Sequence, residues 1–401
     1  SLKAQEARNK IVEELEKQGL IEKVETIDHN LSICYRCERE IEPMPSCQWF
    51  IDMKSKIKNQ KSKSLKELGI GAVRSGKVQF VPKKWEKVYL DWMENVKDWC
   101  ISRQLVWGHQ MPVFIKKQAK FKIQNSKFKI DEESIYVGDS PPEGCGQVED
   151  VLDTWFSSAL WAFATLGYPD KIDKKYYPTT VLSTARDIIY LWVSRMIFTS
   201  LELTGEVPFE KVYIHPTIYN SEGKRMSKSL GTGIDPIEMI EKYGADAVRY
   251  GLTMLNTGVQ DIKFQEDHIM AGKKFSNKLW NISRFIVINL QNSKFKIQNS
   301  KLQIKNQKYL EYIKKIAILE KDTERDLGEF RFGQALERIY HFIWHDFADK
   351  MIEETKSDER EEKTAFLIGA FSRLLDLVEP FMPFIASRLK SEIISTKPET
   401  V

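Results

Sequence analysis

The spacing of apolar residues changes near Gly272, and this change limits the folds that the chain can adopt. Upstream of it, strand-like segments such as Thr180–Ser183 and Lys211–His215 are each followed by a helix or loop. This alternation is typical of an α/β domain with a parallel sheet. Downstream, apolar residues recur at helical spacing, as in Leu336–Phe347 and Phe366–Val378. Such spacing predicts an all-α helical bundle packed behind the α/β domain.

Length, net charge, apolar runs and cysteine content limit the classes of protein to which the chain can belong. The chain has 401 residues, which is enough for two or three domains, and its net charge of +4 gives only weak support for a polyanionic partner. Apolar runs such as Ile282–Leu290 are too short to span a bilayer, and Ser1–Lys10 has no apolar signal core. Five cysteines do not make a disulfide framework in a chain of this length. We therefore expect a cytoplasmic protein that has no membrane partner.

The first residues have the pattern of a helix that lacks a start signal. Ile11, Val12 and Leu15 lie at helical spacing within Ala4–Gly19, and Gly19 is the expected stop. No capping residue precedes the helix. We therefore expect further residues upstream, so that the chain is a fragment of a longer protein.

Three lysine-rich tracts interrupt the chain, at 54–64, 116–130 and 291–308. The string FKIQNSK occurs identically at 121–127 and 295–301. The tracts resemble one short element that was inserted several times into surface loops, because a fold repeat would have a longer period. Such an element can be a solvated basic loop or a non-specific RNA-contact arm, and its alternation of Phe or Ile with Lys can also form a hairpin.

The loop at 223–236, with the sequence GKRMSKSLGTGIDP, carries the strongest chemical signal. Glycines let a loop approach a ligand closely, and lysines supply mobile positive charge for phosphates. Serine hydroxyls and backbone N–H groups can complete a phosphate cradle. The loop leads into a well-marked helix, because Asp235 suits the N-cap, Pro236 the first turn and Glu238 a capping box. A mobile basic loop is therefore anchored on a rigid element.

Arg225–Ser229 resembles the KMSKS signature of class I aminoacyl-tRNA synthetases, with Arg in place of the first Lys. The resemblance implies a loop that closes over ATP and its Mg²⁺, with Ser227, Lys228 and Ser229 at the nucleotide. The resemblance implies that Lys228 stabilises the pyrophosphate leaving group and that Arg225 is a second catalytic cation. The fold implied is the C-terminal half of the Rossmann-like catalytic core, followed by a helical anticodon-binding domain.

Two further segments indicate which synthetases the chain resembles. Residues 94–114 are similar to the start of the second Rossmann half in the valyl, isoleucyl and leucyl group, with Val106 at a usual Trp. Asp153–Leu160 reads DTWFSSAL, which is the valyl pattern; isoleucyl and leucyl enzymes tend to carry Asp-x-Trp-Phe-Asp-Ser. The resemblance makes Trp155 a wall of the amino-acid pocket, with Ile188 as a second candidate. An isoleucyl-type enzyme, or simple core roles for these aromatics, remain alternatives.

Candidate nucleotide contacts lie where predicted strands end. In 181–198 a strand runs into a helix, and we expect Thr184 to cap that helix. Asp187 can face an amino group or ribose hydroxyls, or it can act only as a capping carboxylate. The family usually has Thr-Gly-x-Asp-Ile here, whereas this chain has Ala185. The resemblance also places His215 at the nucleotide, although Pro follows it where relatives have Gly, and a structural role is the alternative.

The resemblance continues through 273–290, 330–355 and 378–389, which are similar to the helical anticodon-binding domain. Lys274, Lys278 and Arg284 are candidate contacts to phosphates of tRNA(Val), and a solvated helix face is the alternative for each. Near the N-terminus, Cys34 and Cys37 could form half of a zinc knuckle, with Cys47 and His29 as further ligands. No second cysteine pair completes a four-cysteine set.

The predicted organisation has three parts. Residues 1–53 form the exit of an editing insertion and a Cys-x-x-Cys region, 54–271 the second half of the catalytic domain, and 272–401 the anticodon-binding domain. The parent activity implied by the resemblance is ATP-dependent activation of L-valine and its transfer to tRNA(Val), by a monomer. The other class signature, His-x-Gly-His, does not occur in this chain. We therefore expect little adenylation by the chain alone, and a non-catalytic tRNA-binding protein or an inactive fragment remain alternatives.

Overall fold

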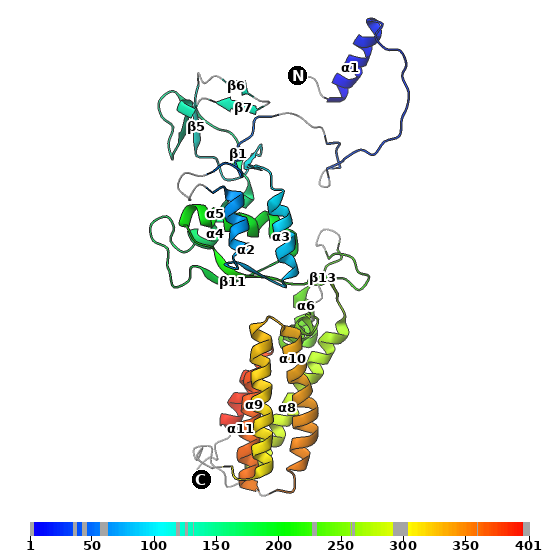
Figure 1. Cartoon of the computed structure of the whole chain (residues 1–401). Helices are drawn as coiled ribbons and strands as arrows, with labels where there is room; N and C mark the ends of the chain where they lie inside the picture. The colour runs from blue at the N-terminus through cyan, green and yellow to red at the C-terminus, as the bar shows by residue number, and fades with distance from the viewer. Residues whose placement is uncertain are drawn as a thin grey trace.

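The computed structural model describes residues 4–34, 38–41, 46–56, 63–117, 121–124, 127–130, 132–226, 231–256, 258, 261–291, 304–358 and 360–395. Figure 1 shows an α/β unit and an elongated helical bundle that follow one another along the molecule. This order confirms the predicted change from an α/β part to an all-helical part; Gly272 itself lies within the helix Glu266–Gln291.

A parallel sheet forms the centre of the α/β unit. Its order is β11 (Thr179–Thr184), β12 (Phe209–Ile214) and β2 (Gln79–Val81), and both pairings are parallel. The middle strand β12 buries Phe209, Val212 and Ile214 almost completely, as expected for a strand that is covered on both faces. The predicted parallel sheet is therefore confirmed.

The sheet shares one hydrophobic core with the helices α2 (Leu65–Arg74), α3 (Lys84–Glu94), α4 (Thr154–Ala164) and α5 (Ser194–Thr204). Helix α2 begins with a full capping box, in which the Ser64 hydroxyl accepts from the Glu67 N–H and the Glu67 carboxylate accepts from the Ser64 N–H. Helix α5 ends at Gly205, whose φ of 76° is left-handed. A short 3₁₀ turn (Arg186–Ile188) and a π-helical turn (Ile189–Val193) join β11 to α5.

Short antiparallel pairs lie beyond the helices. Strand β1 (Phe50–Ile51) pairs with β3 (Trp99–Cys100), and β4 (Ser102–Arg103) pairs with β10 (Val151–Leu152). A three-stranded sheet has the order β8 (Ile135–Val137), β5 (Val113–Lys116) and β9 (Cys145–Gln147). In the second lysine-rich tract, β6 (Phe121–Gln124) and β7 (Lys127–Ile130) pair in antiparallel fashion, which agrees with the hairpin alternative.

Helix α1 (Ala4–Lys17) confirms the predicted N-terminal helix, and Gly19 follows it with a φ of 65°. Its apolar residues are uncovered, since Ile11 is 61% exposed. In Figure 1 the helix stands apart from the α/β unit, at the end of a long extended segment. Among the described residues, no helix is both long enough and apolar enough to cross a membrane.

A small connecting region joins the two large units. Strand β13 (Thr217–Tyr219) pairs in parallel with β14 (Asp261–Lys263), and helices α6 (Pro236–Tyr243) and α7 (Ala245–Met254) lie between them in sequence. Helix α7 packs closely on α8 (Glu266–Gln291) because Gly272 has no side chain; a Cβ there would lie 2.8 Å from the Ala247 carbonyl oxygen. Asp246 of α7 also accepts from the backbone N–H groups of Phe384 and Ile385.

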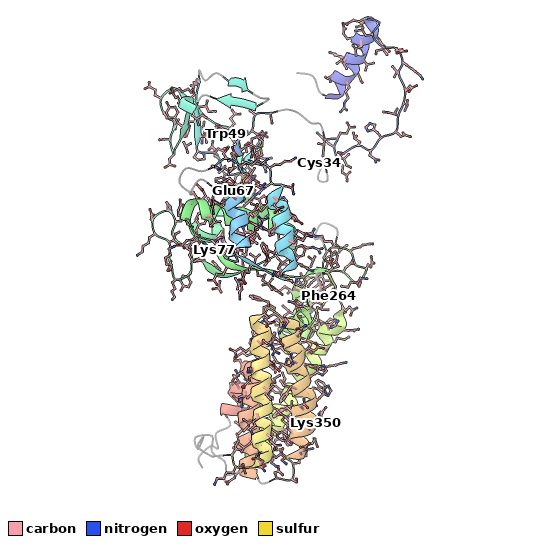
Figure 2. The ribbon with its side chains drawn as sticks, viewed as in Figure 1. Cys34, Trp49, Glu67, Lys77, Phe264 and Lys350 are labelled. Carbon is pink, nitrogen blue, oxygen red and sulfur yellow. The ribbon has the colours of Figure 1, made fainter. Side chains whose placement is uncertain are left out.

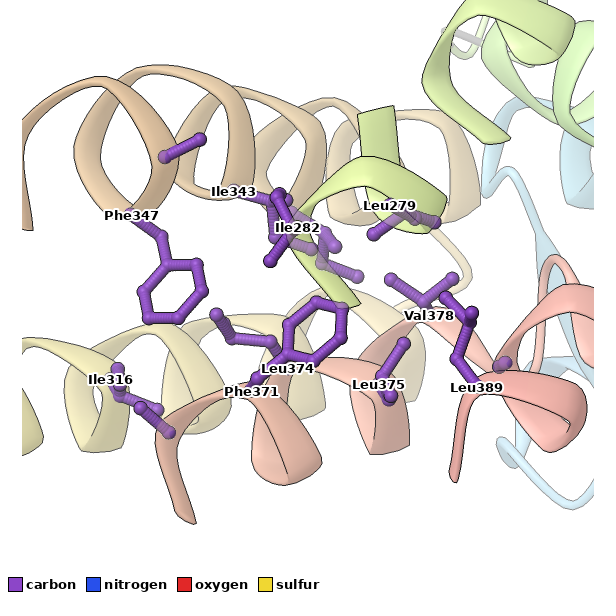
Figure 3. Packing of buried hydrophobic residues seen from close by; sticks show 14 of the residues in the cluster. Leu279, Ile282, Ile316, Ile343, Phe347, Phe371, Leu374, Leu375, Val378 and Leu389 are labelled. Atoms are coloured by element: carbon purple, nitrogen blue, oxygen red, sulfur yellow. The ribbon is translucent and has the colours of Figure 1, made fainter. Parts of the chain in front are cut away.

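The bundle is the predicted helical domain. It contains α8, α9 (Gln307–Gly328), α10 (Phe332–His341), a π-helical segment (Phe342–Ile352), α11 (Arg360–Val378) and α12 (Pro383–Ser395). Figure 3 shows its core, in which Phe347 and Phe371 stack at 6.0 Å between ring centres beside Leu374 and Leu375. The apolar repeats seen in the sequence are the residues that fill this core.

A buried carboxylate fixes the turn between α9 and α10. Asp326 is 1% exposed, and its side chain accepts from Arg331 at 2.6 Å and from Arg338 at 3.1 Å. Burial alone would raise the pKa of the Asp326 carboxyl, but the two arginine hydrogen bonds lower it below its ordinary value of 3.8.

Replacing Asp326 tests this ion pair through stability. At neutral pH we expect Asp326→Asn to lower the free energy of unfolding by about 2 kcal/mol, because both arginines lose their carboxylate. The folded-state pKa lies below the unfolded one, so the stabilisation is complete above pH 3.8 and is lost as the pH falls through the lowered value. Urea unfolding at several pH values measures the difference between parent and variant. A difference that persists in acid would contradict this account.

Candidate active site at the end of the parallel sheet

The ends of β11 and β12 meet at the edge where ligands bind in open α/β sheets. The backbone N–H of His215, just after β12, donates to the carbonyl of Thr184 at 3.1 Å. Strand β11 leads directly into the turn that carries Asp187. The His215 side chain is exposed, and its Nδ1 lies 3.0 Å from the Pro216 carbonyl oxygen. Two candidate nucleotide residues therefore lie on adjacent strand ends, and their binding role stays a prediction.

The expected helix cap at Thr184 is wrong. Thr184 is 4% exposed, and its hydroxyl has no hydrogen-bond partner within the described part of the chain. The residue at the start of the turn is Ala185, which makes no side-chain cap bond. The chain enters a 3₁₀ turn and then a π turn before α5, so the spacing of an ordinary α-helical N-terminus does not apply.

Asp187 pairs with the first residue of the signature motif. Its carboxylate lies 3.0 Å from the Arg225 guanidinium. The Asp187 side chain is 44% exposed and that of Arg225 is 72% exposed, so the pair faces solvent. The structure thus brings together two predicted site residues that are distant in sequence.

Arg186 anchors the same region, although the sequence did not identify it as a site residue. It donates to the Tyr219 hydroxyl at 2.9 Å and pairs with Asp261 at 2.8 Å, so it joins the end of β11 to β13 and β14. Burial alone would lower the pKa of Arg186, but the bond to Asp261 and the nearby charges raise it. Its partners lie 33 and 75 positions away in sequence, so no local pattern could have identified the contacts.

A tight turn presents Arg225. The Asn220 N–H donates to the Lys224 carbonyl at 2.9 Å, and the Asn220 side chain accepts from the Lys224 N–H at 2.7 Å. Gly223 has a φ of 82° and lies against Lys263 of β14, so a larger residue there would be strained. Ser227, Lys228 and Ser229 lie outside the described residues.

Helix α6 resumes beyond the motif as predicted. Asp235 accepts from the Ile237 N–H at 2.8 Å, Pro236 is the first helical residue, and Gly244 follows the helix end. Figure 2 shows Phe264 beside this region, at the junction of the α/β unit and the bundle; its N–H donates to the Tyr219 carbonyl at 2.8 Å. The signature motif is therefore framed by anchored backbone on both sides.

Trp155 and Ile188 are half-buried, and their role as pocket walls stays a prediction. Trp155 lies in the first turn of α4, and Ile188 ends the 3₁₀ turn before α5. Trp192 is also half-buried, and its indole N–H donates to the Ser158 carbonyl of α4 at 3.0 Å. Trp192 therefore fastens the segment that carries Ile188 to the helix that carries Trp155.

A cluster of charged residues lies at the start of α4. Asp153 Oδ2 is 3.0 Å from the Trp99 indole nitrogen, and it is 3.2 Å from a guanidinium nitrogen of each of Arg103 and Arg195. The Arg195 guanidinium also lies over the Trp99 ring, 4.1 Å from its centre. Burial lowers the pKa of Arg195 to about 10, the Asp153 charge acts against this, and the Arg103 charge adds to it.

The predicted zinc ligands are described only in part. The Cys34 N–H donates to the Arg39 carbonyl and the Cys34 carbonyl accepts from the Glu38 N–H, both at 2.8 Å, which closes a tight turn. Cys37 lies outside the described residues, and Cys47 is exposed. Figure 2 places Cys34 on the extended N-terminal segment, away from the sheet. In the parts of the chain that the structure covers, no three His, Cys, Asp or Glu residues are grouped to hold a metal, so zinc binding stays a prediction.

The three candidate tRNA contacts lie on α8 and differ in environment. Lys274 and Arg284 are exposed. Lys278 is half-buried, pairs with Asp349 at 2.9 Å and lies over the Trp344 ring at 4.9 Å. The charge of Lys278 therefore serves the bundle itself, whereas the other two cations face solvent.

Residues 4–265 match the model of tRNA synthetases class I (I, L, M and V), and residues 310–401 match the anticodon-binding domain of tRNA ligase. The chain belongs to the class I tRNA synthetases of this group.

Within the family, similar proteins are valine–tRNA ligases. That of Pseudothermotoga lettingae is 42% identical over 409 residues, covering 98% of this chain and 45% of the relative. That of Thermotoga maritima is 41% identical over 395 residues, covering 96% and 43%. The predicted valyl resemblance is confirmed, and the chain spans a little under half the length of these relatives.

Solved structures confirm the predicted fold. The methionyl-tRNA synthetase of Mycobacterium tuberculosis in complex with methionyl-adenylate aligns with a TM-score of 0.61 at 16% identity, covering 91% of this chain and 70% of that chain. The ternary LeuRS–tRNA–LeuAMS complex from Agrobacterium radiobacter aligns with a TM-score of 0.59 at 19% identity, covering 79% and 45%. At these identities the likeness concerns the fold alone.

The two arginines at the sheet edge should differ in their contribution to stability. We expect Arg186→Gln to lower the free energy of unfolding by about 1 kcal/mol, because it removes charge-assisted bonds from a half-buried site. Arg225→Gln should cost less than about 0.5 kcal/mol, because its ion pair faces solvent. Urea unfolding of both variants measures this order. Equal losses, or a larger loss for Arg225→Gln, would show that the anchor is assigned to the wrong arginine.

Proposed function

We propose that this chain is the signature-motif-bearing part of a valine–tRNA ligase, which activates L-valine with ATP and transfers it to tRNA(Val). The observation that carries the proposal is the identity of about 40% with valine–tRNA ligases over nearly the whole chain. The valyl-type stretch Asp153–Leu160 supports the choice of amino acid. A monomer in the cytoplasm is the setting that we expect for this activity.

In the proposed reaction, the valine carboxylate attacks the α-phosphorus of ATP, which forms valyl-adenylate and expels pyrophosphate. Negative charge develops on the leaving oxygens, and Lys228 and Arg225 supply positive charge for it. Mg²⁺ enters with ATP, because this ion binds mainly through substrate phosphates and one or two carboxylates. Asp187 is the carboxylate at this edge of the sheet, and its exposed pairing with Arg225 leaves it accessible to a ligand's ribose or amino group.

Trp155, Ile188 and Trp192 would form the apolar walls of the valine pocket. All three are half-buried, and they come from two segments that a hydrogen bond between Trp192 and Ser158 holds together. Rigid aromatic walls suit a small branched side chain, because pocket volume determines which aliphatic group fits. Exposed Lys274 and Arg284 on α8 would contact tRNA phosphates and orient the substrate without reading its sequence.

The proposal is tested in a chimera in which this chain replaces the matched part of the Pseudothermotoga lettingae valine–tRNA ligase. We expect valine-dependent ATP–pyrophosphate exchange by the chimera, with valine preferred over isoleucine by about tenfold or more, because one extra methylene must fit the pocket. The isolated chain should show little exchange, since it lacks a His-x-Gly-His sequence. A chimera that exchanges with isoleucine but not valine, or robust exchange by the chain alone, would overturn these expectations.

Within the active chimera, Lys228→Ala should reduce the exchange rate by roughly 10²–10³-fold, the effect of removing one positioned stabiliser of transition-state charge. The KM for valine should change little, because Lys228 is assigned to the leaving group. Lys224→Ala is the matched control: it removes a lysine from the same segment, but one that pairs with Glu222 at the surface at 3.0 Å. Equal losses in the two variants would show that only the general charge of the segment matters.

A further inference from the structure

Asp153 precedes α4 but does not act as its cap. Aspartate at an N-cap normally accepts from the N–H groups of the first turn. Here the side chain makes no such bond, and the residue is 5% exposed. Its carboxylate is instead directed to the cluster with Trp99, Arg103 and Arg195, in which the Arg103 side chain is 40% exposed. A cap bond stabilises helices by about 1 kcal/mol, and at Asp153 the interactions with Trp99, Arg103 and Arg195 stand in its place.

The cluster joins four elements through one oxygen atom. Asp153 Oδ2 interacts with Trp99 of β3, Arg103 of β4 and Arg195 of α5. The Asp153 N–H also donates to the Ile101 carbonyl at 2.7 Å, which ties the start of α4 to the segment between the two strands. Arg195, whose side chain is 12% exposed, is held in place from the other side by the Trp99 ring. A buried charge held by several partners permits little movement, because breaking one contact exposes an uncompensated charge.

The proposed pocket residues lie beside this cluster. Trp155 is two residues after Asp153, and Trp192 is three residues before Arg195. The Trp99 ring also contacts Phe156 of the same first turn, at 6.0 Å between ring centres. Further along α4, Ser158 accepts from Trp192. Trp155 therefore lies between two links that fasten α4 to the segment bearing Ile188 and Trp192, one ionic at its start and one in its second turn.

We propose that Asp153, Arg195 and Trp99 are positioning residues that set the distance between Trp155 and the wall formed by Ile188 and Trp192. The inference rests on the proposed function, because it assumes that these walls enclose the amino acid. None of the three positioning residues needs to touch the substrate. Loosening the cluster should widen the pocket and weaken the binding of valine, while the nucleotide end of the sheet keeps its geometry.

The chain offers a matched control for this test. Asp326 in the bundle is likewise a buried aspartate held by two arginines, but it lies in the last turn of α9. Asp153→Asn and Asp326→Asn therefore make the same chemical change, in the same type of interaction, at two different places. Both should lower stability, but only one should alter amino-acid binding.

The variants are compared in the chimera by ATP–pyrophosphate exchange. We expect Asp153→Asn to raise the KM for valine at least about tenfold, as for the loss of fit in an apolar pocket, with the KM for ATP within about twofold. Asp326→Asn should leave both KM values unchanged. Arg195→Lys should recover part of the loss seen in Arg195→Gln, because lysine keeps the charge but not the planar fork.

A milder variant keeps the test decisive if Asp153→Asn does not fold. Trp99→Phe removes the indole N–H together with the five-membered part of the ring, but it keeps an aromatic ring under Arg195, and we expect it to raise the KM for valine about threefold. Trp85→Phe on α3 is its control and should have no effect on the KM for valine.

If the parent chimera shows no valine-dependent exchange, the proposed function fails. If the parent is active but Asp153→Asn or Trp99→Phe leaves the KM for valine unchanged, the positioning role is wrong.

Discussion

The carboxylate of Asp153 is the point at which the α/β unit is held together around its proposed amino-acid pocket. Three donors from β3, β4 and α5 converge on one of its oxygens, at 3.0 to 3.2 Å. Apolar packing alone would fix the contact between α4 and α5 less strictly, since cores tolerate repacking if volume is conserved. A buried charge with matched partners is more restrictive, because every displacement leaves a charge uncompensated. In our proposal, the position of Trp155, and with it the width of the proposed pocket, follows from that restriction.

A second set of charged residues, more exposed to solvent, lies at the edge of the sheet where we expect the nucleotide. Arg186 joins β11 to β13 and β14, and the exposed Asp187–Arg225 pair brings the stem of the signature motif to the same edge. The Arg186 anchor and the Asp187–Arg225 pair differ in burial, and therefore in what they can do. A half-buried anchor keeps the strand ends in register, whereas an exposed pair contributes little stability and can exchange its partner for a ligand at little cost. In the proposed activation step, a rigid amino-acid pocket beside an adaptable nucleotide edge would let the amino acid be selected while the loop closes over ATP.

Local patterns in the sequence predicted most of the fold and part of the site. Helical spacing identified the bundle core around Phe347 and Phe371, and Asp235 with Pro236 marked the start of α6, because these signals act within one or two turns. The signature motif and the valyl stretch were recognisable for the same reason. The interactions of Asp153 were not predictable, since its partners lie 54 and 42 residues away. The predicted cap at Thr184 failed because the chain passes through a 3₁₀ and a π turn there, a choice made by tertiary packing rather than by local preference.

The central claim is that Asp153 and Arg195 act as one unit on the amino-acid pocket. A double-mutant cycle measures this most directly, with Asp153→Asn, Arg195→Gln and the combined variant compared in the chimera by their KM for valine. The account predicts that the double variant binds valine about as poorly as either single variant, because the second substitution removes a contact that is already lost. Independent, multiplicative losses, with KM rising as the product of the two single effects, would contradict it.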